Sequence, residues 1–225
     1  MVDKTTRQEY IKSLTEVQEK VIEMGIAARE AVESAMKAFI QQNKNMAARV
    51  MQEDDRIDDM TIDIEDLCIL LIAKQQPIAH DLRVIATGFK ISTDLERIGD
   101  HAFDIAKIAY DINKDAPMKN LDFFYTSQLG ACAIEMLNIA IEAYKKEDIT
   151  LAEKVCVKDD EMDELFAKTF FELSSLVTNE VARAQQITEL LFIARFLERI
   201  GDHATNIAEW VIYLETAERI RKTKK

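Results

Sequence analysis

At 225 residues, of which 48% are hydrophobic, the chain is long enough to bury a substantial core in one or two domains. Its net charge of −12 excludes a general affinity for nucleic acid, whose phosphates it would repel, and favours cations or basic protein surfaces as partners. No apolar run approaches the roughly 20 residues that span a bilayer and the N-terminus has no signal-peptide pattern, so we expect a soluble, cytoplasmic protein.

The scarcity of glycine (5) and proline (2) predicts an all-α fold of long helices. In chain order, hydrophobic periodicity predicts six helices, over roughly residues 3–42, 45–74, 79–112, 121–146, 149–177 and 180–220. Asn45 and Asp148 are the predicted N-caps, and Pro77 and Pro117 mark breaks between helices. Residues 113–120 form the predicted linker between the third and fourth helices.

An internal repeat indicates that the chain contains two copies of one three-helix unit. Residues 95–106 read LERIGDHAFDIA and residues 197–208 read LERIGDHATNIA, at an offset of 102. Upstream of Pro77 the offset is 105, because the first copy carries three extra residues near that proline. We therefore predict two tandem, pseudo-symmetric three-helix bundles, as domains 1–113 and 120–222.

Four of the five glycines fall into matched pairs in this repeat, Gly25 with Gly130 and Gly99 with Gly201. Gly99 and Gly201 occur mid-helix among small seam residues, where glycine costs about 1 kcal/mol relative to alanine. The pattern predicts a close approach between helices at both positions.

Acidic residues recur on one flank of the second and third predicted helices. With the apolar seam placed at heptad positions a and d, Glu96 falls at e and Asp100 at b. Asp54 and Asp58 take the same two positions in the preceding helix. An antiparallel hairpin brings the e positions of its two helices side by side. Asp58 then lies level with Glu96 and Asp54 with Asp100, and both pairs have Pro77 as their midpoint in the sequence. Four carboxylates are therefore expected to converge at one level.

The second copy repeats this quartet with Asp159, Asp163, Glu198 and Asp202. Both of its cross-helix pairs have their midpoint beside Asn179, the predicted turn residue. The heptad of its middle helix is less regular, because Lys158 and Glu172 fall at d positions.

Two quartets of like charge need compensation, since a carboxylate pair about 4 Å apart costs on the order of 4 kcal/mol at an effective dielectric of about 20. Pairing with Arg56, Arg97 or Arg199, or simple solvation, is one explanation. A bound cation is the other, and the duplication of the quartet favours it. Carboxylate-only ligation suits magnesium, manganese, calcium or iron.

Three further residues are secondary candidates for these sites. Asp104 extends the first acidic stripe by one turn, whereas its counterpart Asn206 is neutral. His101 and His203 occupy equivalent positions, about 100° around the helix from the acids, which favours a contact between helices over direct ligation. No Glu-x-x-His motif occurs, so the chain does not match a ferritin-type di-iron oxygenase.

Nothing in the sequence indicates catalysis. It contains no nucleophile elbow, P-loop, dinucleotide glycine pattern or zinc-ligand spacing. Cys68, Cys132 and Cys156 stand singly in apolar helical patterns, as is typical of buried thiols in a reducing compartment. Clustered carboxylates would also suit a metal-dependent phosphohydrolase or a metal-storage protein, and both stay open as alternatives.

The chain resembles the PhoU family, the bacterial regulators of phosphate transport, over essentially its whole length. The matching motifs are Gln75-Gln76-Pro77, Asp81-Leu82-Arg83, the two LERIGD segments at 95–100 and 197–202, and Asn206-Ile207-Ala208-Glu209. Their order, duplication and spacing together make the resemblance specific.

The resemblance implies metal binding through duplicated E/D-x-x-x-D motifs, with iron or zinc as the metal, and the carboxylate ligands leave magnesium or manganese as alternatives. These motifs map onto Asp54/Asp58, Glu96/Asp100, Asp159/Asp163 and Glu198/Asp202. It also implies a homodimer that negatively regulates the phosphate-starvation response and phosphate uptake. Such a protein would couple the ATPase subunit of the phosphate ABC transporter to a sensor histidine kinase, and would reach the membrane only through these partners.

Overall fold

A computed structural model describes residues 4–111, 124–179 and 183–219 of the chain, which are almost entirely helical. The helices are α1 (Lys4–Ile40), α2 (Lys44–Gln75), α3 (Ala79–Asp111), α4 (Phe124–Lys146), α5 (Ile149–Asn179) and α6 (Ala184–Thr216). No strand occurs in these ranges. The predicted all-α fold of six long helices is confirmed, while the predicted linker 113–120 with Pro117 lies outside the described residues.

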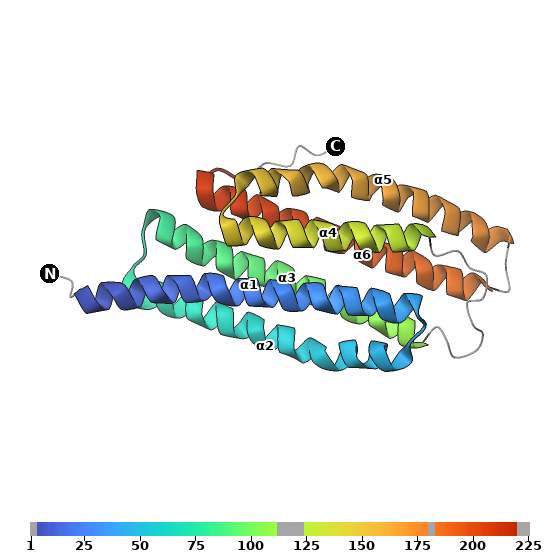
Figure 1. Ribbon diagram of the computed structural model, residues 1–225, viewed down its shortest axis with the longest axis horizontal. Helices are drawn as coiled ribbons and strands as arrows, with labels where there is room; N and C mark the ends of the chain where they lie inside the picture. Colours follow the sequence, from blue (N-terminus) through green and yellow to red (C-terminus); the bar gives the residue numbers. More distant parts are fainter. Residues whose placement is uncertain (1–3, 112–123, 180–182, 220–225) are drawn as a thin grey trace.

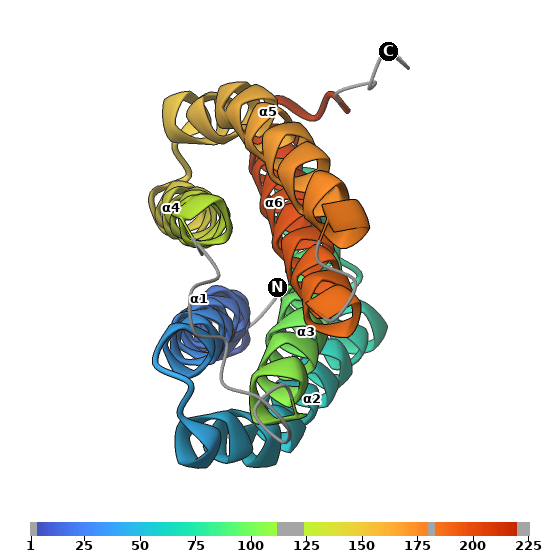
Figure 2. The same ribbon diagram turned by 90° about the vertical axis from the view of Figure 1, so that its right-hand side faces the viewer.

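The helices form two three-helix bundles, α1–α3 and α4–α6, that lie side by side along their length (Figure 1). Figure 2 looks along the bundles and shows α2 and α5 at opposite outer edges, with α1, α3, α4 and α6 between them. The bundles meet where α3 packs against α6 and α1 packs against α4. The third helix of each repeat therefore faces its own counterpart.

The seam predicted from the heptads is the buried face of these helices. Leu95 and Ala102 of α3 are buried, and so are their counterparts Leu197 and Ala204 of α6. Because α3 and α6 each contact both their own bundle and the other one, their apolar stripes are broad and rich in small residues.

One pair of matched glycines lies at a close contact between the two bundles. A Cβ added to Gly25 of α1 would lie 3.0 Å from Ile141 Cγ1 of α4, and one added to Gly130 of α4 would lie 2.6 Å from Met36 Cε of α1. Ile141 is the repeat counterpart of Met36. The α1–α4 contact thus obeys the pseudo-twofold symmetry that the sequence repeat predicts.

The other glycine pair, Gly99 and Gly201, lies at equivalent contacts, each between two helices of one bundle. A Cβ on Gly99 would lie 3.1 Å from Ile57 Cδ1 of α2, and a Cβ on Gly201 would lie 3.1 Å from Met162 Cγ of α5. The predicted close approach of helices at these two glycines is confirmed.

Three of the residues predicted to mark helix ends lie in the described part of the chain, and two of them, Pro77 and Asp148, are confirmed. Pro77 follows the left-handed Gln76 (φ 48°) in the connection between α2 and α3. Asp148 accepts a hydrogen bond from the Leu151 amide at 3.1 Å, as an N-cap does. The prediction of Asn45 as an N-cap is wrong. Asn43 caps α2 instead and accepts from the Met46 amide at 3.1 Å, because α1 ends earlier than predicted and the turn is short.

Candidate metal centres

The first acidic quartet lies on the hairpin of α2 and α3. Burial, followed by the charges of Asp58 and Asp100, raises the pKa of Asp54 to about 6. Burial and Asp100 also raise the pKa values of Asp58 and Glu96. On the hairpin, the charge of Asp100 therefore reaches Asp54, Asp58 and Glu96, the three other carboxylates that the heptad pattern selected.

The register of the hairpin explains why these side chains meet. Ile57 packs against Gly99, and the Cys68 thiol donates to the Ile85 carbonyl at 3.5 Å. Each pair straddles the break at Pro77 almost evenly, so residues equidistant from the proline lie at one level of the hairpin.

Among the described residues, arginine forms ion pairs only with the two acids of this quartet that α3 carries. Arg97 Nη1 lies 2.8 Å from Asp100 Oδ2, and Arg97 Nε lies 3.4 Å from Glu96 Oε2. Within the described part of the chain, the carboxylates of Asp54 and Asp58 have no hydrogen bond and no ion pair. The carboxylate oxygens of the two α2 acids are therefore available to bind a cation.

In the second quartet, the side chain of Glu198 is only 13% exposed. Its Oε1 accepts from Arg195 Nη1 at 2.7 Å. Its Oε2 is buried without a hydrogen-bond partner in the structure. Burial, then the charges of Asp202 and Asp163, raise the pKa of this carboxyl. A buried oxygen without a donor is the feature that a cation would satisfy.

Asp159 of this site has a different environment from its repeat counterpart Asp54. It accepts a hydrogen bond from the Thr205 hydroxyl at 3.0 Å, and the repeat counterpart of Thr205 is Phe103. Asp163 is exposed. The two quartets thus share their positions but differ in their neighbours.

The residues present suit a hard cation by their chemistry, since they supply carboxylate oxygens at mutually repelling positions. Within the residues that the structure covers, no three His, Cys, Asp or Glu side chains are placed so that they could hold a metal ion together. Metal ligation by the eight carboxylates therefore stays a prediction, supported by the open α2 acids and by Glu198 Oε2.

The secondary candidates lie at the contact between α3 and α6. His203 Nδ1 lies 2.8 Å from Asp94 Oδ1, whereas the His101 ring stacks on Phe196 with centroids 5.6 Å apart. The two imidazoles face each other at 5.8 Å. Phe196 is the repeat counterpart of Asp94, so equivalent histidines meet different partners. Burial, then His203, lowers the pKa of His101 to about 4, which keeps this ring neutral.

This contact borders an open groove of about 890 Å³ between α3 and α6. Asp104 lines it, and burial together with Asp100 raises the pKa of Asp104. The counterpart Asn206 donates to Asp94 Oδ1 at 3.1 Å instead. The sequence analysis did not identify Asp94. The available signal was the mismatch between Asp94 and Phe196 just before the two identical LERIGDHA segments.

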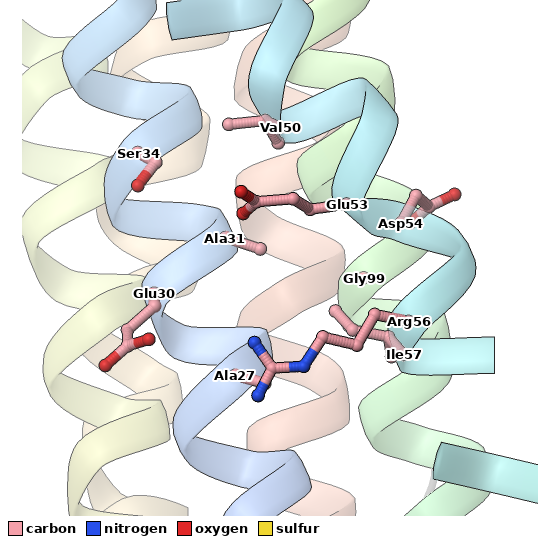
Figure 3. Close-up of a pocket in the computed structure, with 10 residues that line it drawn as sticks. All are labelled: Ala27, Glu30, Ala31, Ser34, Val50, Glu53, Asp54, Arg56, Ile57 and Gly99. Atoms are coloured by element: carbon pink, nitrogen blue, oxygen red, sulfur yellow. The ribbon is translucent and has the colours of Figure 1, made fainter. Parts of the chain in front are cut away.

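A smaller cavity, of about 130 Å³, lies between α1 and α2 beside the first quartet. Figure 3 shows Glu53 and Arg56 extending from α2 towards α1, where Glu30 lies, while Asp54 points to the other side of α2. The cavity therefore has a rim of mixed charge, and Asp54 is the member of the quartet that lines it.

Among the described residues, no helix is long and apolar enough to cross a membrane.

Comparison of the chain with known sequences gives full-length matches. The sequence model of the PhoU domain matches twice, at residues 21–109 and 126–211. A Clostridium acetobutylicum protein, named as a phosphate-specific transport system accessory protein PhoU homolog, is 38% identical over 216 residues, covering 96% of this chain and 98% of its own. A protein of the same name from Aquifex aeolicus is 39% identical over 213 residues, covering 93% of this chain and 94% of its own.

Solved structures show the same architecture. The crystal structure of PhoU from Pseudomonas aeruginosa superimposes with a TM-score of 0.90 at 31% identity, covering 93% of this chain and 100% of that one. The phosphate transport system regulatory protein PhoU from Streptococcus pneumoniae gives a TM-score of 0.85 at 27% identity, covering 94% of this chain and 99% of that one.

Proposed function

The chain belongs to the PhoU family, and on that premise we propose that it is a regulatory accessory protein of a phosphate-specific transport system. It acts as a negative regulator of the phosphate-starvation response and of phosphate uptake, without catalysing a reaction. The observation that carries this proposal is the match, at nearly complete coverage of both chains, to relatives that are named as accessory proteins of a phosphate-specific transport system.

The proposed partners are the ATPase subunit of the phosphate ABC transporter and a phosphate sensor histidine kinase. A cytoplasmic protein would reach the membrane through these partners, and the lack of a spanning helix in the described residues is consistent with that. Long helical faces with a net charge of −12 favour docking onto basic surfaces. We propose that the protein works as a homodimer.

We further propose that each acidic quartet holds metal, with iron or zinc expected from the family and magnesium or manganese as alternatives on donor chemistry. In the first site the ligands are Asp54 and Asp58 of α2 with Glu96 and Asp100 of α3. The second site uses Asp159, Asp163, Glu198 and Asp202. A bound cation would neutralise the clustered charge and link the two helices of each hairpin.

The regulatory function is tested in a bacterium whose only PhoU-family gene is this one. Alkaline phosphatase activity in phosphate-rich medium is compared between the parent, a deletion strain, and the deletion strain carrying the gene on a plasmid. We expect high activity in the deletion strain alone and low activity once the gene is restored. Equal activity in all three strains would contradict the proposed role.

A further inference from the structure

An apolar pocket lies outside the acidic quartets, where the C-terminal part of α6 meets α2 and α3. Ile72 of α2 and Ile85 and Phe89 of α3 line it on one side, and Trp210 and Tyr213 of α6 line it on the other. Its volume is about 240 Å³. The pocket is therefore built from both repeats.

The helix that forms its aromatic wall is fixed in place. Arg83 Nε of α3 donates to the Leu214 carbonyl near the end of α6 at 2.8 Å. The rings of Trp210 and Tyr213 pack edge to face, with centroids 5.7 Å apart. The wall is thus held in position before any ligand arrives, which lowers the entropic cost of binding.

The two charged residues of the pocket are both cations. Lys90 makes no hydrogen bond and no ion pair with any described residue. Arg219 lies 5.1 Å above the Trp210 ring and 5.5 Å from that of Tyr213, and it has no carboxylate partner in the described part of the chain. The described residues that line the apolar pocket include no carboxylate, so its charge is positive, and cations beside an apolar surface make a local site for an anion.

A second, polar pocket of about 410 Å³ shares Lys90, Trp210, Tyr213 and Arg219 with the first. Thr93 and Asn206 line its far end together with two carboxylates, those of Asp94 and Glu209. The two pockets together reach the size range of roughly 300–1,000 Å³ that is usual for small-ligand sites. The combined site is apolar at one end and polar and acidic at the other, and it contains both cations.

Comparison of the repeats shows that the fold does not require these features. The repeat counterpart of Lys90 is Phe192, which is 53% exposed, and the counterpart of Trp210 is Ile108. The two copies keep the same seam and the same acidic positions, yet the cation and the aromatic wall are present in one copy only.

We propose that this site binds a small amphiphilic anion. Its apolar or aromatic body packs on Phe89 and Trp210, and its acidic group lies between Lys90 and Arg219. This function is additional to the regulatory role and does not depend on it.

The sole tryptophan of the chain is Trp210, so its fluorescence reports on the pocket directly. The intact protein is titrated with 1-anilinonaphthalene-8-sulfonate, an aromatic anion, and separately with N-phenyl-1-naphthylamine, which has a similar body without the sulfonate. We expect saturable quenching of Trp210 by the anion at one molecule per chain, and at least about tenfold weaker binding of the neutral amine.

Two variants and one control make the test specific. Lys90→Gln, at an exposed position, should weaken binding of the anion about tenfold, and Ala86→Leu, which fills the pocket, should abolish the quenching. Lys107→Gln removes an exposed lysine elsewhere on α3 and should change nothing. Circular dichroism checks that each variant is folded.

Equal binding of the two probes would overturn the proposal and indicate an apolar docking surface instead. Quenching by the anion that survives both Lys90→Gln and Ala86→Leu would also overturn it, as would a failure of the anion to quench Trp210 at all.

Discussion

Among single residues, Asp54 has the least compensated charge in the first quartet. Its raised pKa means that the folded state binds a proton more tightly than the unfolded chain does. The stabilising contribution of the protonated form is complete below pH 4 and is lost as the pH rises through about 6. At neutral pH, the metal-free protein therefore carries an unfavourable charge at this position.

The substitution Asp54→Asn removes that charge. We expect it to increase the free energy of unfolding of the metal-free protein by about 1–2 kcal/mol at pH 7, after allowance for solvent screening, and to have little effect at pH 4. Urea unfolding at the two pH values measures this difference. Asp66→Asn, at an exposed position of the same helix, is the matched control. A gain of the same size at both pH values would show that charge is not the cause.

The three cysteines should differ in reactivity. Burial raises the pKa of Cys68 to about 12 and also raises that of Cys132, whereas Cys156 is half-buried. Because the thiolate is the reactive form, iodoacetamide should label Cys156 first in the native protein. Peptide mass spectrometry over time measures this order. In urea all three should react alike, and labelling of native Cys68 as fast as Cys156 would contradict the burial of its thiol.

Among the helices, the glycines show how closely each pair approaches and what lies opposite. A Cβ on Gly88 of α3 would lie 2.7 Å from Val17 Cγ1, a branched and buried side chain. A Cβ on Gly130 of α4 would instead meet Met36 Cε, the flexible end of a long side chain. The first contact resists insertion of a methyl group, while the second can yield.

Alanine at these two positions should therefore have opposite effects. Gly88→Ala should lower the free energy of unfolding by about 1–3 kcal/mol through overpacking. Gly130→Ala should be neutral or stabilising by up to about 1 kcal/mol, because helix propensity improves and Met36 can move. Chemical denaturation measures both. The double variant Gly88→Ala/Val17→Ala should recover part of the loss, and no recovery would argue against a clash with Val17.

The sequence predicted contacts within each hairpin better than contacts between bundles. Heptad position and the break at Pro77 were sufficient to bring Asp58 and Glu96 together, because an antiparallel hairpin leaves one free variable, its register. The contact between Asp94 and His203 could not be found in that way. It depends on how the two repeats face each other, which helical periodicity does not specify.

For the molecule as a whole, duplication built a symmetric core whose surface then diverged. Gly25 and Gly130 show the symmetry of the core. Gly25 faces Ile141, Gly130 faces Met36, and Ile141 and Met36 are themselves repeat counterparts. Asp94 and Phe196 show the divergence at the contact between bundles. We therefore expect the two acidic quartets to bind metal independently, with different affinities.

Linkage gives a prediction for the stability of the whole chain. A metal that binds only the folded state should raise the melting temperature, because it relieves repulsion in both quartets. Differential scanning calorimetry with and without iron(II) or zinc should show this increase, and EDTA should reverse it. An identical increase in a chain that carries Asp58→Asn, Glu96→Gln, Asp163→Asn and Glu198→Gln would place the metal elsewhere.

The most direct test of the duplicated metal sites is elemental analysis of the purified protein, as metal bound per chain. The wild type is compared with Asp58→Asn/Glu96→Gln, with Asp163→Asn/Glu198→Gln, and with the control Asp66→Asn. We predict that each double variant binds about half as much metal as the wild type, that the control binds the full amount, and that all four proteins remain helical. Unchanged metal content in both double variants would contradict the assignment of these carboxylates as ligands.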